Sequence, residues 1–118
     1  MKSSVTLVVA TLNAVSTAAF AACENPSIAT VPDGSSATME QLLEAQAGVK
    51  AYMAAMEVYL ACINEELETA GDDAPAEFKS LMVTRHNTAI AEMETVADAF
   101  NQQVKAYRAA HPEDSPQQ

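Results

Sequence analysis

Three methionines and one histidine are the residues of this 118-residue chain that could hold a metal ion. The thioether sulfurs belong to Met53, Met56 and Met93, and the imidazole belongs to His86. Soft sulfur ligands together with an imidazole can bind Cu(I). Methionine also fills irregular hydrophobic cores, and a single polar residue in a core layer can fix the register of two helices. The four residues are therefore weak candidates for a copper site, beside a purely structural interpretation.

The two cysteines, Cys23 and Cys62, suggest a second kind of chemistry. Residues 1–21 are typical of an export signal, because Lys2 precedes a mostly apolar run and Ala19-Phe20-Ala21 fits a small-x-small cleavage site. A pair of cysteines in an oxidising compartment is expected to form a disulfide. Alternatively, the segment 20–23 loosely resembles a bacterial lipoprotein box, in which Cys23 would carry a lipid anchor. We therefore expect a periplasmic or secreted protein, or an outer-membrane lipoprotein.

The sequence contains none of the common catalytic motifs. It has no glycine-rich phosphate loop, no Gly-x-Ser-x-Gly, no HExxH and no CxxC, and it has only three glycines. We predict a non-enzymatic protein without a cofactor. The net charge of −10 at pH 7 argues against nucleic acid and against anionic membrane surfaces as partners. No segment after the signal is long and apolar enough to span a membrane, so the expected partner is an unknown envelope protein or a second copy of the chain.

Two long stretches carry apolar residues that alternate three and four positions apart, which is the stripe of a coiled-coil helix. The first stripe runs over residues 39–67 and the second over residues 83–107. If the chain folds back at residues 71–75, the two stripes meet in antiparallel layers. These layers are Met39–Tyr107, Leu42–Val104, Gln46–Phe100, Val49–Ala97, Met53–Met93, Met56–Ile90, Leu60–His86 and Ile63–Val83. The predicted fold is all-α, an antiparallel two-helix hairpin with coiled-coil-like packing.

Local signals set the expected boundaries. Thr38 and Gln41 fit a capping box at the start of the first helix, and Gly71 is a typical stop at its end. Asp73 is the expected cap of the second helix, with Pro75 in its first turn. The chain then divides into a signal peptide (1–21), an extended N-terminal strip (22–37), a helical hairpin (38–110) and a disordered tail (111–118).

One flank of the predicted hairpin is apolar, and it forms a groove beside the two stripes. Its side chains include Tyr52, Tyr59 and Val96. Cys62 lies on the same flank, so we expect the strip to run along this groove, with Ile28 and Val31 near the tyrosines and the disulfide at its far end. The same side chains are the candidates for contact with a partner. Dimerisation into a four-helix bundle is the other way to cover the groove.

Four short motifs suggest a family. They are Cys23-Glu24-Asn25-Pro26, Pro32-Asp33-Gly34, Tyr59-Leu60-Ala61-Cys62 and Arg85-His86-Asn87. With them, most of residues 23–108 resembles small exported helical proteins of proteobacteria, which are functionally uncharacterised. The resemblance implies an exported, disulfide-linked helical fold and no activity. We expect a non-enzymatic interaction or structural protein of the bacterial cell envelope, with a periplasmic ligand or copper carrier and an envelope lipoprotein as alternatives.

Overall fold

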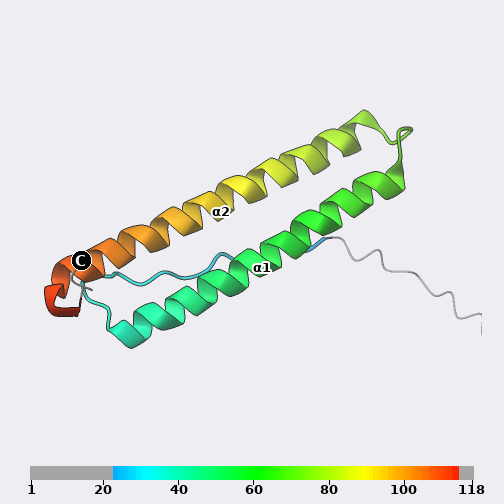
Figure 1. The fold of residues 1–118 in the computed structure, drawn as a ribbon. Helices are drawn as coiled ribbons and strands as arrows, with labels where there is room; N and C mark the ends of the chain where they lie inside the picture. The colour runs from blue at the N-terminus through cyan, green and yellow to red at the C-terminus, as the bar shows by residue number, and fades with distance from the viewer. Residues whose placement is uncertain (1–22, 115–118) are drawn as a thin grey trace, which may run out of the picture.

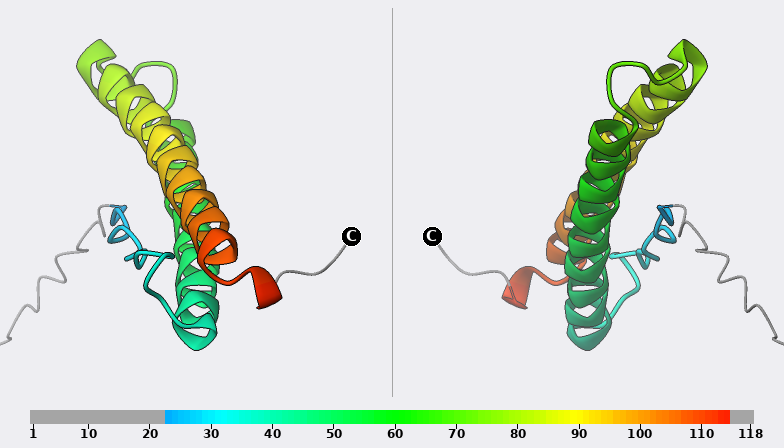
Figure 2. Two further views of the ribbon diagram at one scale, coloured as in Figure 1. Left: turned by 90° about the vertical axis from the view of Figure 1, so that its left-hand side faces the viewer. Right: turned by 90° about the vertical axis from the view of Figure 1, so that its right-hand side faces the viewer.

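The protein is a hairpin of two long helices, seen in a computed structural model that describes residues 23–114. Helix α1 (Met39–Ala70) and helix α2 (Ala76–Ala110) run antiparallel and cross at an angle (Figures 1 and 2). A short 3-10 helix, η1 (Pro112–Asp114), follows α2. The described residues contain no strand, so the predicted all-α hairpin is confirmed. The expected signal peptide lies outside the described residues.

The predicted ends of α1 are confirmed by their hydrogen bonds. The Thr38 hydroxyl accepts from the backbone N–H of Gln41 at 3.1 Å, and the Gln41 side-chain oxygen accepts from the N–H of Thr38 at 3.0 Å. At the other end, the N–H of Gly71 donates to the carbonyl of Leu67 at 3.2 Å. Gly71 has a φ of 72°, which glycine adopts at little cost. Local chemistry therefore fixes both ends of this helix.

Helix α2 begins later than expected. Its N-cap is Pro75 rather than Asp73, and no side chain caps it. The physical reason is that proline disfavours helical geometry in Ala74, the residue before it, and Pro75 itself has an extended ψ of 140°, so the helix starts only after Pro75. The tip of the hairpin is closed instead by a bond from the N–H of Ala74 to the carbonyl of Gly71, at 3.2 Å. The Lys79 ammonium also donates to the carbonyl of Asp72 at 2.6 Å.

The core is one cluster between the two helices. It consists of Val49, Tyr52, Met56, Tyr59 and Ile63 from α1, with Met82, Ala89 and Val96 from α2. Met56 and Ile63 are completely buried. The predicted layers placed the core midway between the two stripes. The observed cluster is instead shifted toward the flank that carries Tyr52 and Tyr59. Residues spaced seven apart on α2 face inward, with Ala89 at the middle, where its small side chain lets the helices approach closely.

This shift corrects several predicted layers. Val83 is 51% exposed and Ile90 is 38% exposed, although their predicted partners, Ile63 and Met56, are fully buried. Gln46 is also exposed rather than part of the core. The cause is the strip, which adds apolar side chains on the tyrosine flank and makes that flank the centre of a three-part core.

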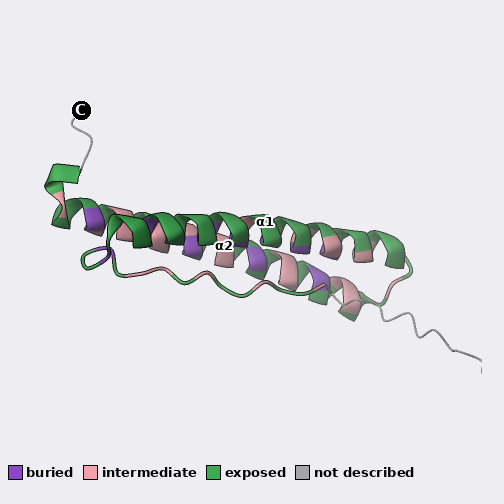
Figure 3. Cartoon of the chain, turned by 90° about the horizontal axis from the view of Figure 1, so that it is seen from below, coloured by how far each residue is buried: buried purple, intermediate pink, exposed green. Residues whose placement is uncertain are grey.

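The strip, residues 23–37, runs extended along this flank and is buried along part of its length (Figure 3). Ala29 and Val31 pack against the core cluster, whereas Ile28 is 63% exposed, which corrects the expectation that Ile28 packs near the tyrosines. Successive side chains of an extended chain point to opposite sides, so residues 29 and 31 share a face and residue 28 does not. The predicted coverage of the groove is confirmed.

A tight turn at residues 33–36 brings the strip into close contact with α2. The Asp33 carboxylate accepts from the N–H of Ser35 at 3.0 Å and from its hydroxyl at 2.6 Å. These hydrogen bonds lower the pKa of Asp33. The N–H of the buried Gly34 donates to the side-chain oxygen of Gln103 at 2.8 Å. The backbones are so close that a Cβ atom at Gly34 would overlap the Gln103 carbonyl.

The end of α2 is more ordered than expected. The Tyr107 hydroxyl donates to the Asp114 carboxylate at 2.9 Å, and the rings of Tyr107 and His111 stack with centroids 4.3 Å apart. Residues 111–114 therefore form a packed turn, which corrects the prediction of a disordered tail for this part. Residues 115–118 lie outside the described residues. Tyr107, which is 4% exposed, supplies the surface on which the turn packs.

Candidate functional site

The tyrosine-lined groove is filled by the protein itself. Tyr52, Tyr59 and Val96 are only 4%, 6% and 4% exposed. The strip and α2 cover them, and they belong to the core cluster. These three predicted partner residues are therefore core residues, and because the strip covers them, as we expected, they are not accessible to a partner.

Two buried polar side-chain atoms in this interior lack hydrogen-bond partners. The Tyr52 hydroxyl and one carboxylate oxygen of Glu92 are buried, and neither has a hydrogen-bond partner within residues 23–114. Burial raises the pKa of Tyr52, and the negative charge of Glu92 raises it further. Sequence reasoning missed Glu92. Its spacing of four residues from Val96 places both on one flank of α2 and could have revealed it.

The two cysteines are joined, as predicted. Cys23 and Cys62 form a disulfide with their Cα atoms 5.7 Å apart. A Glu66 carboxylate oxygen and the two sulfurs lie within 4.8 Å of one another. Because the sulfurs are bonded to each other, they are not thiolate ligands in this state. The bond also occupies the Cys23 sulfur that a lipid anchor would need, so the structure describes the disulfide form rather than the lipoprotein form.

The weak copper candidates are distributed between the core and its edge. Met56 is fully buried within the cluster, while Met53 and Met93 are half-buried and pack against it. His86 is also half-buried. The three methionines are placed as core-filling side chains. A copper site at these residues stays a prediction.

The side of the hairpin that faces away from the strip carries an incompletely buried apolar stripe, which we call the open face. Met53 and Leu60 of α1 are half-buried there. From α2 come the half-buried Met93 and Phe100 and the exposed Val83 and Ile90. Helical spacing puts Met53 and Leu60 on the flank of α1 opposite Cys62, and it puts Val83 and Ile90 on the flank of α2 opposite Thr88, which lines a hollow with the strip. Met93 and Phe100 lie between these residues and the core. Figure 3 shows the strip on one side of the helix pair only.

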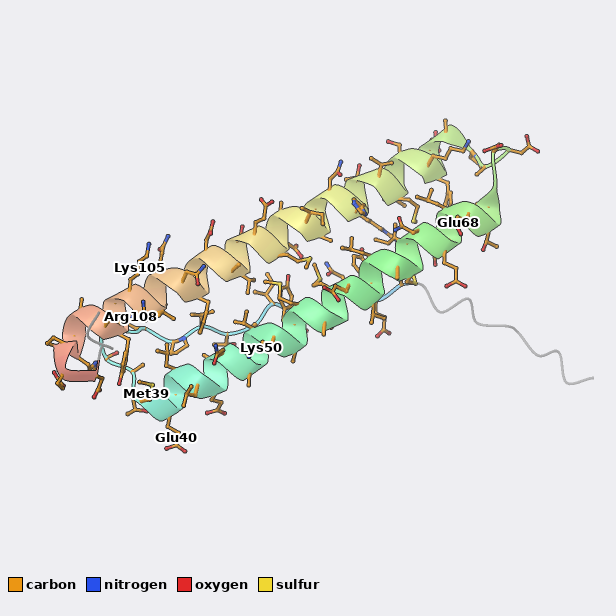
Figure 4. The ribbon with its side chains drawn as sticks, in the orientation of Figure 1. Met39, Glu40, Lys50, Glu68, Lys105 and Arg108 are labelled. Atoms are coloured by element: carbon orange, nitrogen blue, oxygen red, sulfur yellow. A yellow bond between two sulfur atoms is a disulfide. The ribbon has the colours of Figure 1, made fainter. Side chains whose placement is uncertain are left out.

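The open face continues into a groove at the end of the hairpin remote from the tip. This groove has a volume of about 210 Å³ and is lined by Leu42, Phe100 and Val104, among others. Met39 and Arg108 lie at its end, and Glu68 lies far away near the tip (Figure 4). The predicted layers at this end therefore do not close fully.

No family model, no curated protein and no solved structure matches this chain. Among residues 23–114, no helix is both long and apolar enough to cross a lipid bilayer. Evidence for a function therefore comes from the surfaces of the hairpin, and the open face is an apolar one.

Proposed function

We propose that the protein is an exported, non-enzymatic interaction protein of the bacterial cell envelope that associates with a second copy of itself through the open face. The observation that carries this proposal is the apolar stripe that the hairpin leaves uncovered on the side away from the strip. Val83 and Ile90 are 51% and 38% exposed there, and half-buried methionine, leucine and phenylalanine side chains lie beside them.

The disulfide supports the proposed compartment. Disulfides persist in oxidising environments such as the bacterial periplasm, and they are rare where thiols are kept reduced. The Cys23–Cys62 bond ties the strip to α1 and thereby maintains the cover of the tyrosine flank. An oxidising compartment therefore favours the folded form in which the tyrosine flank is covered and the open face is not.

The shape of the open face favours a second copy as its occupant. The residues of the stripe recur three or seven positions apart, as they do along one face of a packed helix, and the stripe is continuous with the contact between α1 and α2. Another helical hairpin of the same length presents the complementary stripe. Two hairpins packed through such stripes form a four-helix bundle, in which the half-buried residues become core residues.

Analytical ultracentrifugation of the oxidised protein at increasing concentration tests this proposal. We expect a dimer at micromolar concentration, because burial of the stripe removes apolar surface from water. The Ile90→Asp variant should be monomeric, because a carboxylate in the bundle core would be unpaired. Its helical content should remain that of the wild type, because Ile90 contributes little to the core of the single hairpin.

A matched control is available on the strip side. Val58 is 71% exposed and lies next to the strip rather than on the open face. The Val58→Asp variant adds the same charge and should remain dimeric. A wild-type protein that stays monomeric at all concentrations, or a Val58→Asp variant that dissociates as readily as Ile90→Asp, would contradict self-association through the open face.

A further inference from the structure

A hollow with both polar and apolar lining lies beside the disulfide, where the strip, α1 and α2 meet. Its volume is about 310 Å³, within the size range of sites for small molecules. The lining residues are Cys23, Asn25, Tyr59, Thr84, Arg85 and Thr88. Arg85 and both threonines come from α2, Tyr59 comes from α1, and the remaining two come from the strip. Three separate segments therefore bring five polar side chains to one place.

The side-chain donors of Arg85, Thr84 and Thr88 in this hollow form no hydrogen bond with the part of the chain that the structure describes. Within residues 23–114, the half-buried Arg85 side chain forms neither an ion pair nor a hydrogen bond. The hydroxyls of Thr84 and Thr88 are likewise without hydrogen bonds in this part of the chain, unlike that of Thr95, which donates to the carbonyl of Ala91 at 2.9 Å. The guanidinium nitrogens of Arg85 are not among the buried atoms, so water reaches them, and an anion in the hollow would take the place of that water.

We infer that this hollow binds the carboxylate of a small organic acid. The planar guanidinium of Arg85 matches a carboxylate through two parallel hydrogen bonds. The threonine hydroxyls and the Asn25 amide supply further donors around it, and the Tyr59 ring and the disulfide form an apolar wall for the body of the ligand. This inference concerns a small ligand and is independent of self-association.

The charge of the protein favours a singly charged ligand. The net charge is −10, and Glu66 lies beside the disulfide at the edge of this region. The repulsion between the protein and an anion grows in proportion to the charge of the anion. One guanidinium balances one carboxylate, so a phosphate dianion should bind more weakly than a monocarboxylate.

Titration of the ¹⁵N-labelled protein with sodium benzoate, followed by NMR, tests the inference. Sodium chloride at equal ionic strength is the reference, and inorganic phosphate is the competing class of anion. We expect saturable shifts in the backbone amides of Asn25, Thr84, Arg85 and Thr88 with benzoate. The Arg85→Gln variant should bind at least about tenfold more weakly, the loss typical of a charge-assisted hydrogen bond.

Two further variants make the test decisive. Lys105→Gln removes one positive charge from α2 at a side chain that projects away from α1, and it should bind benzoate like the wild type (Figure 4). Thr88→Val keeps the charge and should weaken binding several-fold, which provides a second probe if Arg85→Gln does not fold. Absence of saturation with benzoate, equal weakening by Lys105→Gln, or tighter binding of phosphate than of benzoate would overturn the inference.

Discussion

Gly34 is the residue with the strictest steric requirement in the molecule. It is buried at the crossing of the strip and α2, where its N–H donates to Gln103 and its Cα faces the Gln103 backbone. The Pro32-Asp33-Gly34 motif indicates a turn from sequence alone, but it does not reveal that the turn lies against another backbone. That information is long-range, because Gln103 is 69 positions away.

Replacing Gly34 with alanine should destabilise the protein by about 2 kcal/mol, the usual cost of forcing an extra methyl group into a packed site. Urea denaturation of the oxidised protein would measure this change. Gly48→Ala is the matched control, because a Cβ there meets no atom within 4 Å. That substitution removes a glycine from the middle of a helix and should stabilise by about 0.5–1 kcal/mol. Equal effects of the two substitutions would contradict a close contact at Gly34.

Two tyrosines, Tyr52 and Tyr107, show how hydrogen bonding decides whether a buried hydroxyl stabilises or destabilises the folded state. The Tyr52 hydroxyl has no partner within residues 23–114, and that of Tyr107 donates to Asp114. We expect Tyr52→Phe to raise the free energy of unfolding by about 1 kcal/mol and Tyr107→Phe to lower it by a similar amount. Thermal denaturation at pH 7 would compare the variants with the wild type. A loss of stability in Tyr52→Phe would show that its hydroxyl is in fact bonded.

The raised pKa of Tyr52 predicts that the stability of the protein depends on pH in the alkaline range. The pKa of Tyr52 is raised above 10.0 by burial and by the charge of Glu92, so the folded state holds the phenolic proton more tightly than the unfolded chain does. The contribution to stability is complete below pH 10 and is lost as the pH rises through the folded pKa. The stability of Tyr52→Phe should therefore fall less than that of the wild type between pH 9 and pH 11.

At the scale of elements, the strip is the third layer of a fold that has only two helices. Ala29 and Val31 cover the core, and the disulfide and the Gly34–Gln103 hydrogen bond hold the strip to both helices. The two helices and the ends of α1 could be predicted because heptad spacing, the Thr38 cap and the Gly71 stop act locally. The centre of the core could not, because it depends on how the strip packs, and an extended segment has no periodic signal.

Breaking the disulfide should release the strip. The Cys62→Ser variant should be less stable by about 4 kcal/mol, the loop-closure estimate for cysteines 39 positions apart. Its melting temperature should equal that of the reduced wild-type protein. Hydrogen exchange of the amides at residues 29–37 should become faster in the variant, since their cover depends on the bond. Identical melting temperatures for the oxidised and reduced wild type would contradict the role given to this crosslink.

At the scale of the whole molecule, the hairpin has two unequal sides. One side is covered by the strip and includes the Arg85 hollow, and the other is the open face. The acidic tip, with Glu68 near it, lies far from Met39 and the groove (Figure 4). Sequence patterns predicted the apolar flank and the strip that covers it, and they also made its side chains candidates for contact with a partner, which their burial corrects. The open face and the Arg85 hollow could not be predicted, because they depend on how the strip and the two helices pack together.

The position of the crosslink has a consequence for how the chain responds to proteases. Both cysteines precede the tip, so the covalent ring spans residues 23–62 and excludes all of α2. One cut within the ring leaves the two pieces joined until the protein is reduced. One cut anywhere from residue 63 onward produces a separate fragment at once. The same number of cleavages thus gives different masses under non-reducing conditions, and this difference reports whether the strip or the second helix opened first.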